Sequence, residues 1–257
     1  MMEIEIDFTR SAQDNANDYY NKSKKLLQKK EGAAKAIKDL EKRLLKIQSI
    51  EKKSDRRIVK EVKREWYEKF HWFYTSNNLL VLGGRDAHQN ELLNSKHFEE
   101  NDLFFHADIF GASLVLLKGG AAEGREIRQE VAEFAACYSS AWKEGLSTVD
   151  VYAMNRNQVS KSSSKGSLGT GSFLMSGERD WYRSIKLNLM MFIKGEKLHT
   201  VPMATFEKMA DKPATHVKIG IGNYKKSDAA KKIAAKLDYP DLDIIMRQLP
   251  VGNFRIE

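Results

Sequence analysis

The first seventy residues contain almost nothing that would interrupt a helix. Between residues 11 and 70 there is no proline, and Gly32 is the only glycine. The stretch is rich in Lys, Glu, Ala, Leu and Gln, which are strong helix formers. An apolar residue recurs with the 3-4-3 spacing of a coiled-coil seam at Ile37, Leu40, Leu44 and Ile47. The pattern predicts a helical hairpin or coiled coil over residues 1–70, whose tip lies either near Gly32 or in the polar run 49–55.

This helical arm carries most of the net positive charge of the chain. The 257 residues have a formal net charge of +8. Residues 1–70 hold 19 Lys and Arg against 13 Asp and Glu, whereas residues 71–257 hold 24 against 22. A basic excess favours polyanions, above all nucleic acid, because binding releases condensed counterions. A well-solvated helix surface has the same composition, so charge alone leaves both interpretations open.

Cysteine content and hydropathy limit the chemistry and the cellular setting. Cys137 is the only cysteine, so neither a disulfide nor a cysteine-based zinc site can form within one chain. A reducing compartment suits such a chain, and we expect it in the cytoplasm. The sequence has no run of about 18 apolar residues and no secretory signal pattern at its N-terminus. We therefore expect no membrane partner and no cofactor.

Beyond the arm, the pattern changes to short strand-like runs separated by turns. Six aromatic residues within 66–74 mark the junction with a globular domain. Strands are predicted at 73–76, 79–82, 103–107, 113–118, 149–154, 172–175, 187–193 and 217–221, and helices at 85–94, 125–144, 228–237 and 242–249. Short strands joined by short turns favour an α+β fold. We predict one compact mixed α/β domain over residues 71–257, with 201–257 as a less certain C-terminal extension.

The first candidate site is a glycine turn at the end of a predicted strand. Gly83 and Gly84 permit a tight turn and would leave backbone N–H groups exposed at the start of a helix, an arrangement that binds phosphate. Arg85 adds a bidentate donor, and Asp86 would cap the helix or orient Arg85. The spacing matches neither a Walker loop nor a dinucleotide fingerprint.

A second candidate is a histidine and an aspartate on the next predicted strand. His106 and Asp108 alternate with apolar neighbours, so their side chains should point the same way. The pair could act as a general base with its orienting carboxylate, or bind a metal together with His88. The simpler alternative is a hydrogen-bonded pair that shapes a loop.

The third candidate is the polar loop 160–171. Ser160 and Lys161 suggest a Ser–Lys nucleophile, but adjacent residues on an extended chain point to opposite sides. A flexible loop in which Lys161 and Lys165 contact phosphate groups is the better functional interpretation. A solvated loop with no ligand remains the alternative.

These motifs occur together in one order that resembles a known family. The matching segments are Ser11-Ala12-x3-Ala16-x2-Tyr19-Tyr20, the aromatic run 66–73, Gly83-Gly84-Arg85-Asp86, Gln89-Asn90-Glu91, His106-Ala107-Asp108, Gly111-Ala112-Ser113, Cys137-Tyr138-Ser139-Ser140-Ala141-Trp142, Gln158-Val159-Ser160-Lys161 and Gly169-Thr170-Gly171-Ser172-Phe173. The ordered set resembles the NFACT-R domain of the NEMF/RqcH family of ribosome quality-control factors. The part before it resembles the end of the coiled-coil middle region of that family.

The resemblance implies that the chain binds RNA. Family members bind the large ribosomal subunit that carries a stalled peptidyl-tRNA, hold tRNA there, and often direct untemplated tailing of the stalled chain. Full-length members begin with a large domain that carries a tRNA-selecting Asp-Arg pair, so Arg85-Asp86 is a different element. We expect RNA or ribosome binding rather than tailing by this chain alone, whether it is the C-terminal half of a longer protein or a naturally short one.

The leading hypothesis is a non-catalytic RNA-binding module of ribosome-associated quality control, which contacts tRNA, large-subunit rRNA or both on stalled subunits. One alternative is a nucleic-acid-processing enzyme that uses His106 and Asp108. Another is an interaction module whose arm binds a coiled-coil protein partner. The predicted RNA-binding residues are Gly83, Gly84, Arg85, Asp86, Gln89, Asn90, His106, Asp108, Ser113, Gln158, Ser160, Lys161 and Lys165.

Overall fold

The computed structural model describes residues 5–54, 65–163, 166–167 and 169–257. The chain divides into two compact units, Met1–Val62 and Lys63–Glu257. None of the helices in the described ranges combines the length and the apolar character needed to cross a membrane.

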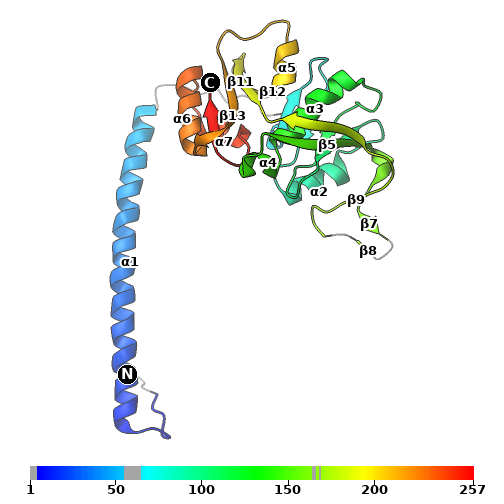
Figure 1. The fold of residues 1–257 in the computed structure, drawn as a ribbon. Coiled ribbons are helices and arrows are strands. Elements are labelled where there is room, and N and C mark those ends of the chain that lie inside the picture. The colour runs from blue at the N-terminus through cyan, green and yellow to red at the C-terminus, as the bar shows by residue number, and fades with distance from the viewer. Residues whose placement is uncertain (1–4, 55–64, 164–165, 168) are drawn as a thin grey trace. The chain divides into compact units, whose positions relative to one another are not determined.

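The first unit contains one long helix, α1 (Ala12–Ser54), of 43 residues (Figure 1). Ser11 begins it by accepting a hydrogen bond from the Asp14 N–H at 3.1 Å. The helix continues through Gly32, so the predicted turn there is wrong. One glycine costs only about 1 kcal/mol relative to alanine, which is too little to end a helix flanked by strong helix formers. Of the other predicted tip, 49–55, the part up to Ser54 is helical and the rest lies outside the described residues.

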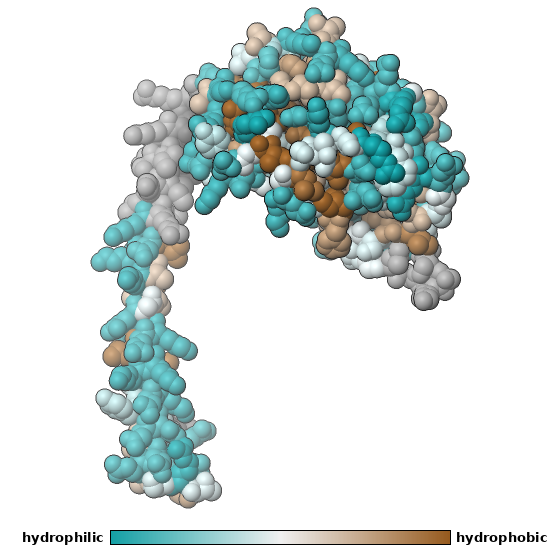
Figure 2. Space-filling view, viewed as in Figure 1, coloured by the Kyte–Doolittle hydropathy of each residue, from teal (hydrophilic) through white to brown (hydrophobic). Residues whose placement is uncertain are grey.

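The predicted apolar seam of α1 is uncovered where the structure describes it. Ile37 and Leu40 are 57% and 58% exposed. Hydrophilic side chains dominate the described surface of this helix in Figure 2. The side chains of Leu44 and Ile47 lie outside the described residues. Whether a second helix packs along this seam therefore stays a prediction.

Two antiparallel sheets form the framework of the second unit (Figure 1). The six-stranded sheet has the order β1 (His71–Tyr74), β2 (Leu80–Gly83), β4 (Val115–Leu117), β3 (Leu103–Ala107), β5 (Thr148–Asn155) and β10 (Asp180–Lys186). The four-stranded sheet has the order β12 (Lys197–Pro202), β11 (Leu189–Lys194), β13 (His216–Tyr224) and β14 (Phe254–Ile256). Two short ribbons pair β6 (Val159–Ser160) with β9 (Leu174–Met175) and β7 (Ser162–Ser163) with β8 (Gly166–Ser167).

The helical segments of this unit are η1 (Trp66–Lys69), α2 (Ala87–Lys96), α3 (Arg125–Cys137), α4 (Ser140–Glu144), η2 (Arg156–Gln158), α5 (Met203–Lys208), α6 (Lys226–Leu237) and α7 (Leu242–Gln248). The mixture of antiparallel sheets and separate helices confirms the predicted α+β class. The strands predicted at 73–76 and 79–82 correspond to β1 and β2, which pair as an antiparallel hairpin. The sequence pattern did not predict β10, β12 or α5.

Helix α3 packs against both sheets. Its Val131 and Phe134 belong to one core that also contains Phe105 of β3 and Val217 of β13. Residues 201–257 therefore share a hydrophobic core with the segment that precedes them. Burial of these apolar side chains is the main favourable contribution to the stability of this unit.

The single helix predicted over 125–144 is wrong, because the structure has two helices, α3 and α4. Ser139 is extended, with ψ of 171°, and its hydroxyl accepts a hydrogen bond from the Ala141 N–H at 3.3 Å. Cys137 before the break and Trp142 after it are both buried. The redirection at Ser139 buries side chains that one straight helix would place on different faces.

A second apolar layer covers the opposite face of the six-stranded sheet. Side chains on a strand alternate between faces, so Phe105 joins the α3 core whereas Phe104 faces the other way. Phe104 packs there in a cluster with Leu93 of α2 and Phe70. Many of the predicted site residues lie on or around this second face.

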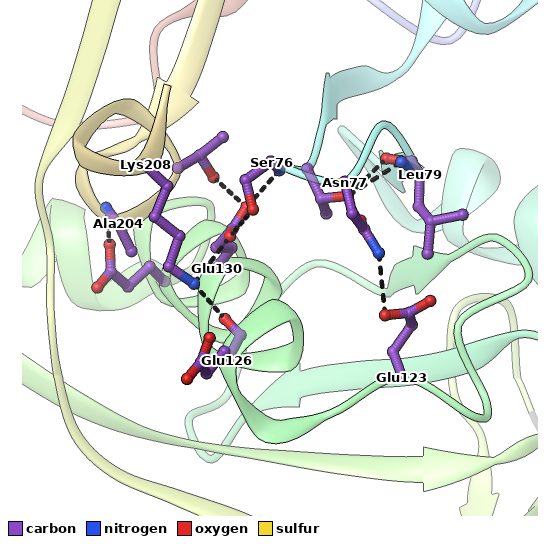
Figure 3. Close-up of polar contacts among 11 residues, drawn as sticks. Ser76, Asn77, Leu79, Glu123, Glu126, Glu130, Ala204 and Lys208 are labelled. Carbon is purple, nitrogen blue, oxygen red and sulfur yellow. Dashed lines mark hydrogen bonds and ion pairs between the residues drawn. The ribbon is translucent and has the colours of Figure 1, made fainter. Parts of the chain in front are cut away.

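A buried carboxylate fastens the β1–β2 hairpin and α5 to α3 (Figure 3). Glu130 of α3 is fully buried. It accepts hydrogen bonds from the Ser76 N–H at 2.9 Å, the Ser76 hydroxyl at 2.6 Å and the Thr205 hydroxyl at 2.9 Å. The Lys208 ammonium completes the set at 3.1 Å. A buried charge with this many donors holds three segments in one arrangement.

We predict that Glu130→Ala lowers the free energy of unfolding by about 3 kcal/mol or more, because it leaves buried donors and one lysine without their acceptor. Urea unfolding measures the change. Glu123→Ala is the matched control. Glu123 accepts one hydrogen bond, at 2.9 Å, from Asn77 of the same hairpin (Figure 3), so this substitution should lower the free energy of unfolding by about 1 kcal/mol or less. Equal losses in the two variants would contradict the role assigned to Glu130.

Candidate nucleic-acid interface

The glycine turn at the end of β2 is a closed corner rather than an open anion cradle. The Gly84 N–H donates to the Leu114 carbonyl at 3.0 Å, and the Ser113 hydroxyl donates to the Gly84 carbonyl at 2.7 Å. Asn90 accepts a hydrogen bond from the Leu114 N–H at 3.1 Å. A Cβ on Gly84 would lie 2.1 Å from Asn90 Oδ1, which explains the glycine. The Gly84 N–H is therefore not available to phosphate, and phosphate binding by the N–H groups at the start of α2 stays a prediction.

The residues after the turn begin helix α2. Asp86 caps the helix by accepting a hydrogen bond from the Gln89 N–H at 2.8 Å. Gln89 accepts one from the Arg85 N–H at 3.1 Å and donates to the Lys69 carbonyl at 3.2 Å. The Arg85 guanidinium does not pair with Asp86 but donates to the Phe70 carbonyl at 2.9 Å. Capping by Asp86 is thus realised, whereas orientation of Arg85 by Asp86 is not.

His106 and Asp108 do not form a catalytic pair. Strand β3 ends at Ala107, so Asp108 lies just beyond it and is exposed. The hydrogen bonds within the described ranges include none between the two side chains. His106 lies 3.4 Å from the Tyr152 hydroxyl through Nδ1. Burial lowers the pKa of His106, although hydrogen bonds with the backbone of Ala107 and the nearby charge of Asp108 act in the opposite direction.

A metal site with these residues is likewise not formed. Within the described ranges, no three His, Cys, Asp or Glu side chains gather closely enough to hold an ion. His88, the third residue considered, is exposed on α2.

The loop from 160 to 171 is fastened to α2 at its base. The Lys161 ammonium forms an ion pair with Glu91 and donates to the Gly169 carbonyl at 2.8 Å. Glu91 also accepts the Gly171 N–H at 3.2 Å. Gly171 has φ of +76°, and a Cβ there would lie 2.8 Å from that of Ala87, so only glycine fits this close approach. Lys161 is therefore engaged within the protein, and Lys165 lies outside the described residues.

A polar cleft of about 670 Å³ opens beside this loop. Its lining consists of Asn94, Glu100, Asn155, Arg156, Asn157, Val159, Ser160 and Lys161. Asn94 Oδ1 is buried and has no hydrogen-bond partner. The predicted residue Gln158 lies between two lining residues and donates to the Glu178 carbonyl at 2.8 Å. Amide and cationic groups at one opening suit a polar, anionic ligand.

An arginine and tryptophan ladder lies on the edge strand β10 and the residue before it. The guanidinium of Arg183 lies 3.9 Å from the centroid of the Trp181 ring. That of Arg179 lies 4.5 Å from the Tyr152 ring and 5.7 Å from Trp181. Trp181 is paired with Tyr152 across the sheet, and Tyr152 in turn contacts His106. The ladder therefore joins a predicted site residue to a cationic, aromatic surface.

Sequence reasoning missed this ladder, although the signal was present. Arginine, tryptophan and arginine alternate at 179, 181 and 183, which is the period of a strand with one cationic and aromatic face. The strand itself was not predicted, so the alternation was not recognised.

With this geometry in place, comparison with known proteins identifies the domain. Residues 69–177 match the family described as the NFACT protein RNA binding domain. The chain is 36% identical over 201 residues to the archaeal Rqc2 homolog aRqcH of Methanocaldococcus jannaschii, covering 75% of this chain and 29% of that protein.

Two animal proteins are similarly related. The chain is 35% identical over 193 residues to the ribosome quality control complex subunit NEMF homolog of Drosophila melanogaster, covering 72% of this chain and 19% of that protein. It is 35% identical over 178 residues to the ribosome quality control complex subunit NEMF of Homo sapiens, covering 65% of this chain and 16% of that protein.

The chain therefore carries an NFACT RNA-binding domain. It is homologous to the NEMF, Rqc2 and RqcH ribosome quality-control proteins, and the resemblance inferred from its motifs is confirmed. It spans less than a third of the length of the three relatives.

We predict that Lys161→Met loosens the loop, because it removes the ammonium that binds Glu91 and the Gly169 carbonyl. Amide exchange at Gly171 should accelerate, while the global free energy of unfolding changes by about 1 kcal/mol or less. Hydrogen exchange and urea unfolding measure the two quantities. Lys143→Met, at an exposed position on α4, is the control. Unchanged exchange at Gly171 would show that Lys161 does not fasten the loop.

Proposed function

We propose that this chain is a non-catalytic RNA-binding module of ribosome-associated quality control. It contacts tRNA, large-subunit rRNA or both on stalled ribosomal subunits in the cytoplasm. The family match to an RNA-binding domain supports this function, and the names of the relatives place them in ribosome quality control. The observation that carries the proposal on this molecule is the ladder of Arg179, Trp181 and Arg183.

The ladder combines the two contacts that RNA recognition uses most often. Guanidinium groups bind phosphates and also stack on bases, and indole rings stack on bases. The Arg183 side chain is 59% exposed, so an RNA strand can reach it. Its ion pair with Asp150, at 2.7 Å, leaves donors of the guanidinium fork available. The polar cleft beside the loop would take a further nucleotide, with Arg156 and the asparagine amides as donors.

The corner formed by Gly83, Gly84, Ser113 and Asn90 supports the site by shape. Its hydrogen bonds hold the start of α2 against β4. In this proposal Asp86, Gln89 and the loop glycines position the RNA-facing surface, because their hydrogen bonds lie within the protein. The basic helix α1 adds attraction to phosphate that does not depend on sequence.

We expect the double variant Arg179→Gln/Arg183→Gln to bind tRNA or large ribosomal subunits about tenfold more weakly than the wild type. The loss corresponds to about 1.4 kcal/mol, within the range for stacked or phosphate-bound arginines. The slope of log affinity against log salt concentration should also become shallower by about 2. Titration of labelled RNA at several salt concentrations measures both quantities.

The matched control is Lys231→Gln/Lys236→Gln, which removes the same charge from exposed positions on α6. It should reduce affinity much less than the arginine double variant. Equal effects of the two double variants would mean that the ladder is not an RNA contact. No binding of any RNA by the wild type would overturn the proposed function itself.

A second candidate function is protein binding through α1, favoured by the exposure of Ile37 and Leu40 at seam positions. The wild type should then associate with a helical partner or a second copy, and salt should change that association little. The double variant Ile37→Asp/Leu40→Asp should not associate. Sedimentation of the wild type and the variant, at low and high salt, measures it. The control is Lys35→Asp/Lys38→Asp on the same helix. This candidate is rejected if the wild type and both variants fail to associate while the RNA affinity of each falls with salt.

A further inference from the structure

Three cationic side chains from distant parts of the sequence gather around one pair of stacked rings. The rings are those of His71 on β1 and Tyr138 after α3, whose centroids lie 4.0 Å apart at an interplanar angle of 27°. On one side, Arg85 donates to the carbonyl of Phe70, the neighbour of His71, at 2.9 Å. The stack thus lies where the glycine corner meets the α3–α4 junction.

The other two cations come from the C-terminal segment. The Tyr138 hydroxyl donates to the Gln248 carbonyl at 2.6 Å, which brings the end of α7, where Arg247 lies, to the stack. The Lys226 ammonium at the start of α6 donates to the following carbonyl, that of Leu249, at 2.9 Å. Helices α6 and α7 therefore bring their cations to the corner that carries Arg85.

The pKa shifts agree with this gathering of like charges. Burial lowers the pKa of Lys226, and the nearby positive charge of Arg85 lowers it further. Burial also lowers the pKa of Arg85; Tyr138 opposes that shift and the charge of Arg247 adds to it. Burial lowers the pKa of His71 well below its ordinary value, with Arg85 and Lys226 as the charged contributors. The positive charge of Arg85 therefore acts on Lys226 and His71, and that of Arg247 acts on Arg85.

Within the described part of the chain this cluster has no carboxylate partner, whereas several other cations of the protein do. Lys118, Lys197 and Lys208 pair with Asp102, Glu68 and Glu130, respectively. Among the described residues, no Asp or Glu forms an ion pair with Arg85, Lys226 or Arg247. Like charges held together in partly buried positions destabilise the fold unless an anion neutralises them.

Several hydrogen-bonding groups in the cluster have no partner among the described residues, which also favours an anionic ligand. Arg85 Nε and His71 Nδ1 are both buried and have no partner. The Lys226 ammonium has donors beyond its bond to the Leu249 carbonyl. Arg247 is exposed at the rim of the cluster. Arginine guanidinium groups and a lysine ammonium with no described carboxylate partner, as in Arg85, Arg247 and Lys226, are the groups that recognise phosphate.

We propose that Arg85, Lys226 and Arg247 form a phosphate-binding subsite, which takes a backbone phosphate of the RNA bound by this domain. The inference rests on the proposed RNA-binding function and adds to it the contact made by residues 201–257. It also assigns a role to Arg85 that the closed glycine corner cannot perform through its own N–H groups. Phosphate at this position neutralises the cluster and fixes the register of the RNA without reading its bases.

The first experiment compares two double variants of equal charge change in RNA binding. Arg85→Gln/Lys226→Gln should weaken binding of tRNA about tenfold or more and make the salt slope shallower by about 2. Lys231→Gln/Lys236→Gln on the same helix should change both quantities much less. Binding of a short RNA oligonucleotide with and without a 5′-phosphate shows whether the subsite takes a backbone phosphate or a terminal one. If the double variant Arg85→Gln/Lys226→Gln loses the same affinity for both oligonucleotides, the subsite binds a backbone phosphate. A loss of affinity only for the oligonucleotide with the 5′-phosphate would overturn that assignment.

The second experiment needs no RNA. Thermal unfolding of the wild type and of Arg85→Gln/Lys226→Gln is measured in sodium phosphate and in sodium chloride of equal ionic strength. Phosphate should raise the melting temperature of the wild type, because it binds only the folded state, and should leave that of the double variant unchanged. Equal responses of the two proteins would overturn the subsite. Arg85→Lys keeps the positive charge, so its melting temperature should still rise in phosphate by most of the wild-type amount. This control shows whether a folding defect, rather than the lost charge, removes the rise in the double variant.

The two ways of failing can be told apart. If the wild type binds RNA but the Arg85→Gln/Lys226→Gln variant keeps its affinity and salt slope, the subsite is wrong and the RNA-binding function stands. If the wild type binds no RNA, the proposed function is wrong, and the RNA phosphate subsite falls with it.

Discussion

The buried carboxylate of Glu130 is the constraint on which the second unit depends. It has no access to water, so its charge must be balanced by donors from the protein. Those donors come from the β1–β2 hairpin and from α5, at opposite ends of the domain sequence. These contacts hold α3 to the hairpin and to α5, and α3 also packs against both sheets. The apolar core around α3 then supplies the larger part of the stability.

This arrangement explains why the C-terminal segment belongs to the candidate interface. Once α3 joins the two sheets, α6 and α7 lie close to the corner at the end of β2, as the hydrogen bonds of Tyr138 and Lys226 show. Arg85 and Lys226, which are more than 140 residues apart in the sequence, are both partly buried there. The absence of a described carboxylate partner for Arg85, Lys226 and Arg247 contrasts with the careful pairing of Glu130 and Lys208.

The proposed interface is built from two kinds of surface. The ladder of Arg179, Trp181 and Arg183 offers cations interleaved with a ring on an edge strand. The glycine corner and the loop fastened by Glu91 offer a fixed shape, because their backbone groups are already satisfied within the protein. Helix α1 belongs to the other unit, and in the proposed function its basic surface adds long-range attraction to RNA. Shape and charge are thus supplied by different elements of the same chain.

The sequence alone determined the helical character of the arm, the α+β class, the β1–β2 hairpin and the family to which the motifs point. These follow from local properties, namely helix propensity, strand alternation and residue order. It also predicted Arg85 and the glycine turn as site residues, which stays a prediction. Only the tertiary structure decided that the Gly84 N–H is used by Leu114, that Lys161 pairs with Glu91, and that α3 ends at Cys137. The first two depend on a partner distant in sequence, which no local pattern encodes, and the end of α3 is set by which side chains the core buries on either side of Ser139.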